Sequence, residues 1–126
     1  MGEWSFTDAW LLTAAAGFGR RGCSLSDLLG AADAINHDVP RADQASISLG
    51  RLSASGLLTV ADGRFCATLQ ARDLYKRRAR PMFEQSASML ELLREVELIE
   101  DEWRFEPAEF DDAFETYRKR VARWTR

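Results

Sequence analysis

One pair of β-strands is evident in this 126-residue chain, and it lies in the middle of a sequence that is otherwise helical in pattern. Residues 57–60 and 64–68 have the composition of short strands, and the Asp62-Gly63 pair between them is a typical hairpin turn. Three helical segments precede this hairpin, and further helical segments follow it. We therefore predict a mainly α-helical fold with one small β-hairpin.

The first two helices are predicted from their capping residues. Thr7 is a suitable N-cap for a helix over residues 7–16, which Gly17 and Gly19 would end. Ser24 is a suitable N-cap for the second helix. The apolar positions of that second helix recur at helical spacing: Leu25, Leu28, Leu29, Ala32 and Ile35.

The third helix is predicted over residues 41–55, with a core stripe of Ala45, Leu49 and Leu52. After the hairpin, Thr68 can cap a fourth helix over residues 69–78. A long helix over residues 82–100 and a final helix from Pro107 to Trp124 complete the chain. We predict a domain at residues 1–80 and a helical extension at residues 81–126. The extension would pack on that domain or form a dimer contact.

Three sequence patterns resemble those of winged helix-turn-helix domains, and more loosely those of MarR-like and PadR-like bacterial regulators. The resemblance covers residues 5–78, and the C-terminal third matches no family that we can name. The patterns are Ser24-Leu25-Ser26-Asp27-Leu28-Leu29 at the second helix, Leu49-x-x-Leu52-x-x-x-Gly56-Leu57-Leu58 from the third helix into the wing, and Phe65-x-x-Thr68-x-x-x-Arg72 at the second wing strand.

The resemblance implies binding to double-stranded DNA, with the third helix in the major groove and the wing near the phosphates. Gln44 and Arg51 are the candidates for reading bases, whereas Arg41, Arg64 and Lys76 are candidates for phosphate contacts. The full set of predicted DNA-binding residues is Arg41, Gln44, Ser46, Ile47, Arg51, Arg64 and Lys76. The function predicted from this resemblance is that of a cytoplasmic transcription regulator acting as a homodimer.

The outward face of the third helix favours a different interpretation. Its members are Asp43, Ile47, Gly50 and Ala54, none of which is a typical reader of base edges. An exposed β-branched residue beside a glycine suits contact with a protein, because glycine lets another backbone come close. The alternative prediction is therefore a non-enzymatic protein-interaction or assembly module that contacts an unidentified protein partner.

Charge is distributed unevenly along the chain, whose net charge is −3. Residues 1–80 carry ten Lys and Arg against eight Asp and Glu, whereas residues 81–126 carry seven against twelve. A dedicated nucleic-acid binder is usually more basic than this. The first two thirds are compatible with DNA binding, and the last third is not.

The final predicted helix carries a heptad-like aromatic and apolar stripe. This stripe consists of Phe110, Phe114, Tyr117, Val121 and Trp124. Acidic residues stand early in the helix and basic residues stand late, with Arg126 among the latter, which suits the helix dipole. Three uses of the stripe remain open: packing on the chain's own core, a homodimer seam, or a membrane-surface helix.

The sequence contains no assembled catalytic or metal-binding constellation. One histidine and two cysteines cannot form a zinc site of familiar spacing, so we expect no metal, no cofactor and no enzymatic activity. No segment predicts a membrane span or a secretory signal. Winged helices commonly add a short strand before the second helix, which would bring Cys23 near Cys66. Reduced thiols and a redox-coupled pair are both compatible with that arrangement.

Overall fold

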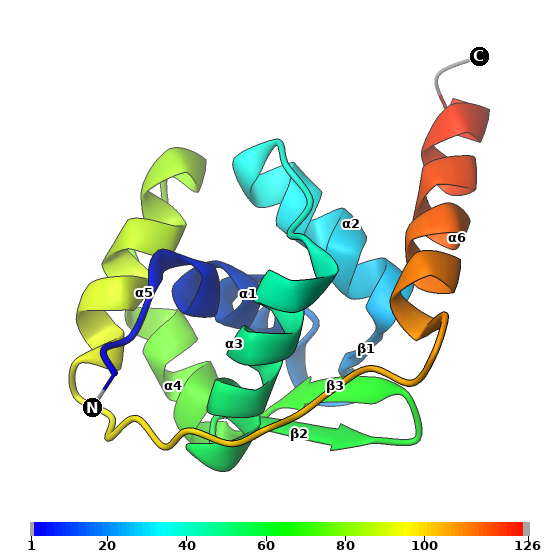
Figure 1. Cartoon of the computed structure of the whole chain (residues 1–126). Coiled ribbons are helices and arrows are strands. Elements are labelled where there is room, and N and C mark those ends of the chain that lie inside the picture. The colour runs from blue at the N-terminus through cyan, green and yellow to red at the C-terminus, as the bar shows by residue number, and fades with distance from the viewer. Residues whose placement is uncertain (1, 125–126) are drawn as a thin grey trace.

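Helices account for most of residues 2–124, the part of the chain that the computed structural model describes (Figure 1). The predicted basic residue Arg126 lies outside the described residues. The helices are α1 (Phe6–Ala16), α2 (Leu25–Asn36), α3 (Ala42–Ala54), α4 (Leu69–Arg77), α5 (Gln85–Leu93) and α6 (Glu109–Trp124), with short 3-10 turns at η1 (Gly19–Arg21) and η2 (Met82–Glu84). The strands are β1 (Cys23–Ser24), β2 (Leu58–Ala61) and β3 (Arg64–Ala67).

Helix α1 is the central element of the core. Every residue from Asp8 to Ala16 is buried, because α1 contacts α2, α3, α4, α5 and β3. A run of Ala, Leu and Trp on all sides of a helix is typical of a helix enclosed by other elements. The Trp10 indole nitrogen donates to the carbonyl oxygen of Ala32 at 2.9 Å, which satisfies a polar atom inside this core.

The N-cap of α1 is Ser5, so the prediction of Thr7 was wrong. Ser5 has a carboxylate three residues later, and the two residues form a capping box. The Ser5 hydroxyl accepts from the Asp8 backbone nitrogen at 3.3 Å, and the Asp8 carboxylate accepts from the Ser5 backbone nitrogen at 2.8 Å. This box satisfies two backbone donors together, whereas Thr7 has no acidic residue at the matching position.

Helices α2 and α3 lie close to their predicted bounds. The Ser24 hydroxyl caps α2, as predicted, and α2 ends at His37 in a left-handed conformation. The predicted core stripe of α3 is confirmed, because Ala45, Leu49 and Leu52 are all buried.

The sheet has three antiparallel strands in the order β1-β3-β2. Strands β2 and β3 pair through the predicted hairpin, and Asp62 and Gly63 both have positive φ angles, as a type I′ turn requires. The short strand expected before α2 is present, since Cys23 pairs with Phe65. The sheet buries Phe65 and Leu58 against the helices.

The long helix predicted over residues 82–100 was wrong at both ends. Residues 82–84 form η2 with Met82 52% exposed, and α5 ends at Leu93. Leu93 is the last fully buried apolar residue of this region. Beyond it the chain turns at Val96, whose carbonyl oxygen accepts from the Trp4 indole nitrogen. Tertiary packing of this kind overrides a helical pattern that was only moderately regular.

Residues 97–106 form an extended segment, here called the strap, that connects α5 to α6 (Figure 1, yellow to orange). Helix α6 begins at Glu109, two residues after the predicted start at Pro107, because Ala108 has a positive φ angle and the Glu109 carboxylate accepts from the Glu106 backbone nitrogen. The described fold is mainly helical with a small three-stranded antiparallel sheet. Within residues 2–124, none of the helices combines the length and the apolar composition needed to cross a membrane.

Candidate nucleic-acid interface

The outward face of α3 is only partly open to solvent. Ile47 is 57% exposed and Asp43 is exposed, as the sequence predicted. Gly50, however, is buried, which corrects the expectation that it lies on an open face. The strap covers it, and Figure 1 shows this segment running across α3 on its way to α6.

The strap backbone comes closest to α3 at Gly50. A Cβ atom at this position would lie 2.8 Å from the carbonyl oxygen of Asp101 and 3.1 Å from Cβ of Trp103. Only glycine leaves room for a backbone this close. One turn earlier, the Ser46 hydroxyl donates to the carbonyl oxygen of Trp103 at 2.5 Å. The close backbone approach expected at Gly50 is therefore present, and the chain's own residues make it.

Two further contacts hold the strap to the C-terminal half of α3 and to its C-cap, Ser55. The Ile99 backbone nitrogen donates to the Ser55 hydroxyl at 2.8 Å. The Arg51 guanidinium forms an ion pair with Glu100 at 2.7 Å. The contacts with α3 thus extend over much of the helix, from Ser46 to Ser55.

Arg51 also reaches into the core. Its Nη1 atom lies 3.0 Å from the carboxylate of Asp8, which is fully buried. Burial lowers the pKa of Arg51, but the hydrogen bonds to Glu100 and Asp8 outweigh it, so this pKa lies above its ordinary value. Arg51, a predicted base reader, is thus held between a buried carboxylate and the strap.

Trp103 anchors the strap through ring contacts. Its ring meets Phe65 of β3 edge-on at 6.2 Å between centroids, and it meets Phe105 edge-on at 4.7 Å. Phe105 in turn contacts Phe110 at 5.4 Å. Edge-to-face geometry is favourable for aromatic pairs. This series of rings connects the sheet to the start of α6.

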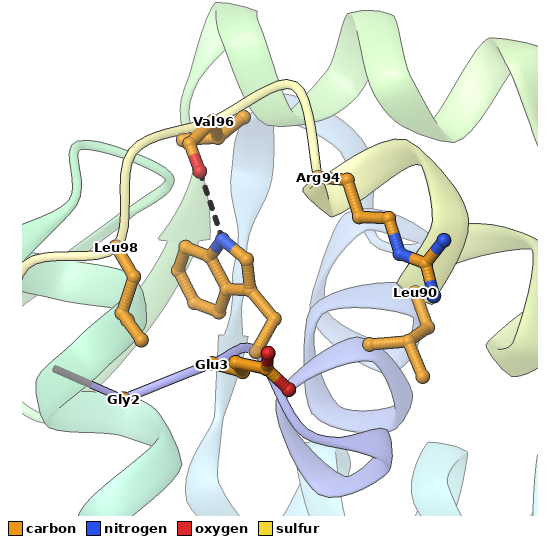
Figure 2. Close-up of a pocket in the computed structure, with 7 residues that line it drawn as sticks. Gly2, Glu3, Leu90, Arg94, Val96 and Leu98 are labelled. Carbon is orange, nitrogen blue, oxygen red and sulfur yellow. Dashed lines mark hydrogen bonds between the residues drawn. The ribbon is translucent and has the colours of Figure 1, made fainter.

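The N-terminal segment fixes the beginning of the strap. Figure 2 shows Val96 and Glu3 on opposite sides of a pocket, with Leu98 between them on one flank and with Leu90 of α5 and Arg94, the C-cap of α5, on the other. The Trp4 indole nitrogen donates to the carbonyl oxygen of Val96 at 2.9 Å. The chain leaves α5 at this point and enters the extended strap.

The remaining predicted DNA-binding residues are spread over three elements. Arg41 forms an exposed ion pair with Asp43 at 3.2 Å, and its backbone nitrogen donates to the side-chain oxygen of Gln44. Arg64 on β3 donates to the carbonyl oxygen of Arg21 at 2.7 Å. Lys76 on α4 is exposed and forms no ion pair with any of residues 2–124.

Helix α6 packs on α2 through the first part of its apolar stripe. Phe110 and Phe114 are half-buried against the core, and the Tyr117 ring lies over Gly30, where a Cβ atom would be 3.1 Å from it. The Tyr117 hydroxyl donates to the Asp33 carboxylate, and Arg120 pairs with Asp27 at 3.1 Å. Phe110, Phe114 and Tyr117, the first three residues of the stripe, thus pack on α2 and the core of the same chain.

The outer part of the stripe is more exposed than its first part. Val121 is 36% exposed and Trp124 is 80% exposed. The use of the stripe for a homodimer stays a prediction, and these two residues are the ones that a second copy could cover.

The two cysteines lie on neighbouring strands but are both free thiols. Cys23 pairs with Phe65 in the sheet, so its side chain shares the buried face with Phe65, and Cys66 belongs to the opposite face. Burial is the main reason that the pKa of Cys23 is raised to about 12. The register of the sheet therefore opposes the redox-coupled pair that the sequence left open.

The sequence did not predict that the strap lies on α3. Its acidic residues have the composition of a solvated run, and nothing in the run itself points to a particular helix. Gly50 was the available signal, because a glycine on the outward face of a helix marks room for a second backbone.

Within the described residues, no group of three or more His, Cys, Asp or Glu side chains could hold a metal ion. Comparisons of this chain with protein-family models, with curated proteins and with solved structures found no match.

Proposed function

We propose that this chain is a winged-helix DNA-binding protein of the transcription-regulator type. The order of its elements supports the winged-helix assignment, since α1, α2 and α3 precede the hairpin and β1 completes the sheet. In such a fold α3 would enter the major groove, and the β2–β3 hairpin would be the wing.

The observation that carries the proposal is a group of cations beside the hairpin that have no acidic partner among residues 2–124. Arg41, Arg51, Arg77, Arg94, Arg118 and Arg120 all form ion pairs. Arg20 and Arg21 of η1 and Arg64 of β3 form no ion pair among residues 2–124, and the hydrogen bond from Arg64 to the Arg21 carbonyl oxygen holds these two residues together. A cation beside a wing that has no acidic partner can bind phosphate, and Arg64 would exchange its bond to the Arg21 carbonyl oxygen for one to phosphate.

Residue roles follow from these positions. Arg64 and Lys76 are proposed phosphate ligands, with Arg41 available once its exposed pair with Asp43 opens. Gln44, Ser46 and Ile47 would face the bases. Arg51 would support α3 from the core through Asp8.

The proposal is tested by binding of a random-sequence duplex at about 50 and about 200 mM salt. We expect affinity in the micromolar range or tighter at the lower salt, with a steep fall at the higher salt. Arg64→Ala should weaken binding to all sequences and reduce the salt slope by about one. Arg94→Ala, which removes an exposed cation that is paired with Glu91 at the end of α5, is the matched control and should leave the slope unchanged.

A second candidate function is a protein-interaction module, and the exposure of Ile47 and Trp124 favours it. A second copy of this chain is the partner to test first. Sedimentation equilibrium should then show a dimer that Trp124→Ala abolishes. Monomers at all concentrations would contradict the homodimer prediction.

A further inference from the structure

The strap combines acidic charge with a position on the predicted DNA-reading helix. It contains five acidic residues and one basic residue, and Glu100, Asp101 and Glu102 stand together in its middle. These three residues line one hollow with Asp43 and Ile47 of α3, where Arg104 is the one cation against four carboxylates. Negative charge therefore accumulates where a DNA phosphate backbone would approach.

The strap also blocks this face sterically. The Asp101 carbonyl lies against Gly50 so closely that even one added carbon would collide with it. Gly50 is buried beneath the strap, and the Ser46 hydroxyl donates its hydrogen to the Trp103 carbonyl, so the strap competes with a base for both positions.

We propose that the strap is an autoinhibitory cover that competes with DNA for α3. This inference rests on the proposed function and specifies how that same site is regulated. The acidic residues repel phosphate within the screening distance of about 8–10 Å at moderate salt, and the backbone excludes the bases.

The strap is attached in a way that permits release. It contains no helix or strand, and its polar contacts with α3 are made by the side chains of Ser46, Arg51 and Ser55. The Glu100 side chain is 53% exposed, so its ion pair contributes little to stability. Arg51 keeps its bond to Asp8 when Glu100 leaves, which preserves the core while the face opens.

Gly50→Ala is the sharpest variant for testing this cover. The added methyl group collides with the strap and improves the helix propensity of α3. Gly30→Ala is the matched control, since it makes the same change in α2 and meets Tyr117 of α6 instead of the strap. Trp103→Ala is a second route to release, because it removes the aromatic anchor and leaves α3 unaltered.

Binding of a random-sequence duplex is measured for the wild-type chain and the three variants at about 50 and about 200 mM salt. We expect Gly50→Ala and Trp103→Ala to bind at least about tenfold more tightly than the wild type, with a larger gain at the lower salt. Gly30→Ala should match the wild type. Hydrogen exchange at residues 99–103 reports whether the strap has opened.

Each other outcome has a distinct meaning. Equal, measurable affinity in the wild type and in both release variants would overturn the cover and leave the proposed function standing. If the strap amides of a variant exchange faster than those of the wild type and the variant still does not bind the duplex, the proposed function is overturned, and the cover with it. If the strap amides of Gly50→Ala and Trp103→Ala exchange no faster than those of the wild type, the strap is held too tightly to act as a releasable cover.

Discussion

Two arginines of the α3 segment have very different structural roles. Arg51 neutralises a fully buried carboxylate, whereas Arg41 pairs with Asp43 at the surface, where both side chains are about 70% exposed. Removing one partner of a buried pair leaves an uncompensated charge inside the core. The free energy of unfolding should therefore depend strongly on Arg51 and weakly on Arg41.

We expect Arg51→Ala to lower the free energy of unfolding by about 3–5 kcal/mol, because it leaves Asp8 unpaired. Arg41→Ala should lower it by less than about 1 kcal/mol. Urea denaturation of both variants beside the wild type measures the difference. Losses of similar size would contradict the buried role of Arg51.

Tyr117 makes a pH-dependent contact between α6 and α2. The hydrogen bond to Asp33 is the main reason that its pKa is raised to about 12 in the folded chain, from an ordinary value of 10.0. A phenol with a raised pKa stabilises the fold fully below its unfolded pKa, and this contribution is lost as the pH rises through the folded pKa. The window for Tyr117 is therefore about pH 10 to 12.

We expect the wild type to be more stable than Tyr117→Phe at pH 8 and to lose that advantage between pH 10 and 12. The measurement is the urea midpoint of each protein between pH 8 and 12. Subtracting one midpoint from the other cancels the effects of alkaline pH that both proteins share. A difference that is constant with pH would show that the Tyr117 hydroxyl does not donate to Asp33 in solution.

At the scale of elements, α6 is attached by one end of its stripe. Phe114 is half-buried against the core, whereas Trp124 is mostly exposed. We expect Phe114→Ala to lower the free energy of unfolding by about 1–3 kcal/mol and Trp124→Ala to change it by less than about 0.5 kcal/mol in the monomer. Thermal unfolding at low protein concentration compares the two. If Trp124→Ala lowered the free energy of unfolding more than Phe114→Ala does, the packed part of the stripe would instead be the C-terminal end of α6.

Elements with strong local signals were predictable from the sequence. Ser24 capped α2, Asp62-Gly63 formed the hairpin, and Leu49 and Leu52 defined the buried side of α3, because each signal acts within a few residues. The predicted end of α5 was wrong. Just beyond the actual end, Trp4 forms a hydrogen bond with Val96, a residue 92 positions away in the sequence. No local pattern records a contact at that separation.

The candidate site was predictable only in part, for the same reason. Ile47 was expected to be exposed and is exposed. The position of Arg51 between Asp8 and Glu100 was missed, because its partners are 43 and 49 residues away and many other acidic residues were available to it.

At the scale of the whole molecule, local stability should decrease from the centre outward. Helix α1 is buried along nearly its whole length, whereas α6 has no fully buried residue. We expect the amides of α1 to exchange with solvent only through global unfolding, and those of the strap and α6 to exchange through local opening at a lower free energy. Native-state hydrogen exchange resolves this order. Exchange of α6 together with α1 would show a single cooperative unit.

The enclosed position of α1 also has a consequence for synthesis of the chain. Helix α1 leaves the ribosome before α5, the helix against which it packs most extensively, and α5 follows several seconds later at about 5–20 residues per second. During that interval the apolar sides of α1 have no α5 to cover them. The growing chain is therefore a natural client for a chaperone that recognises short apolar helices, and slow translation through residues 60–90 would prolong its exposure to aggregation.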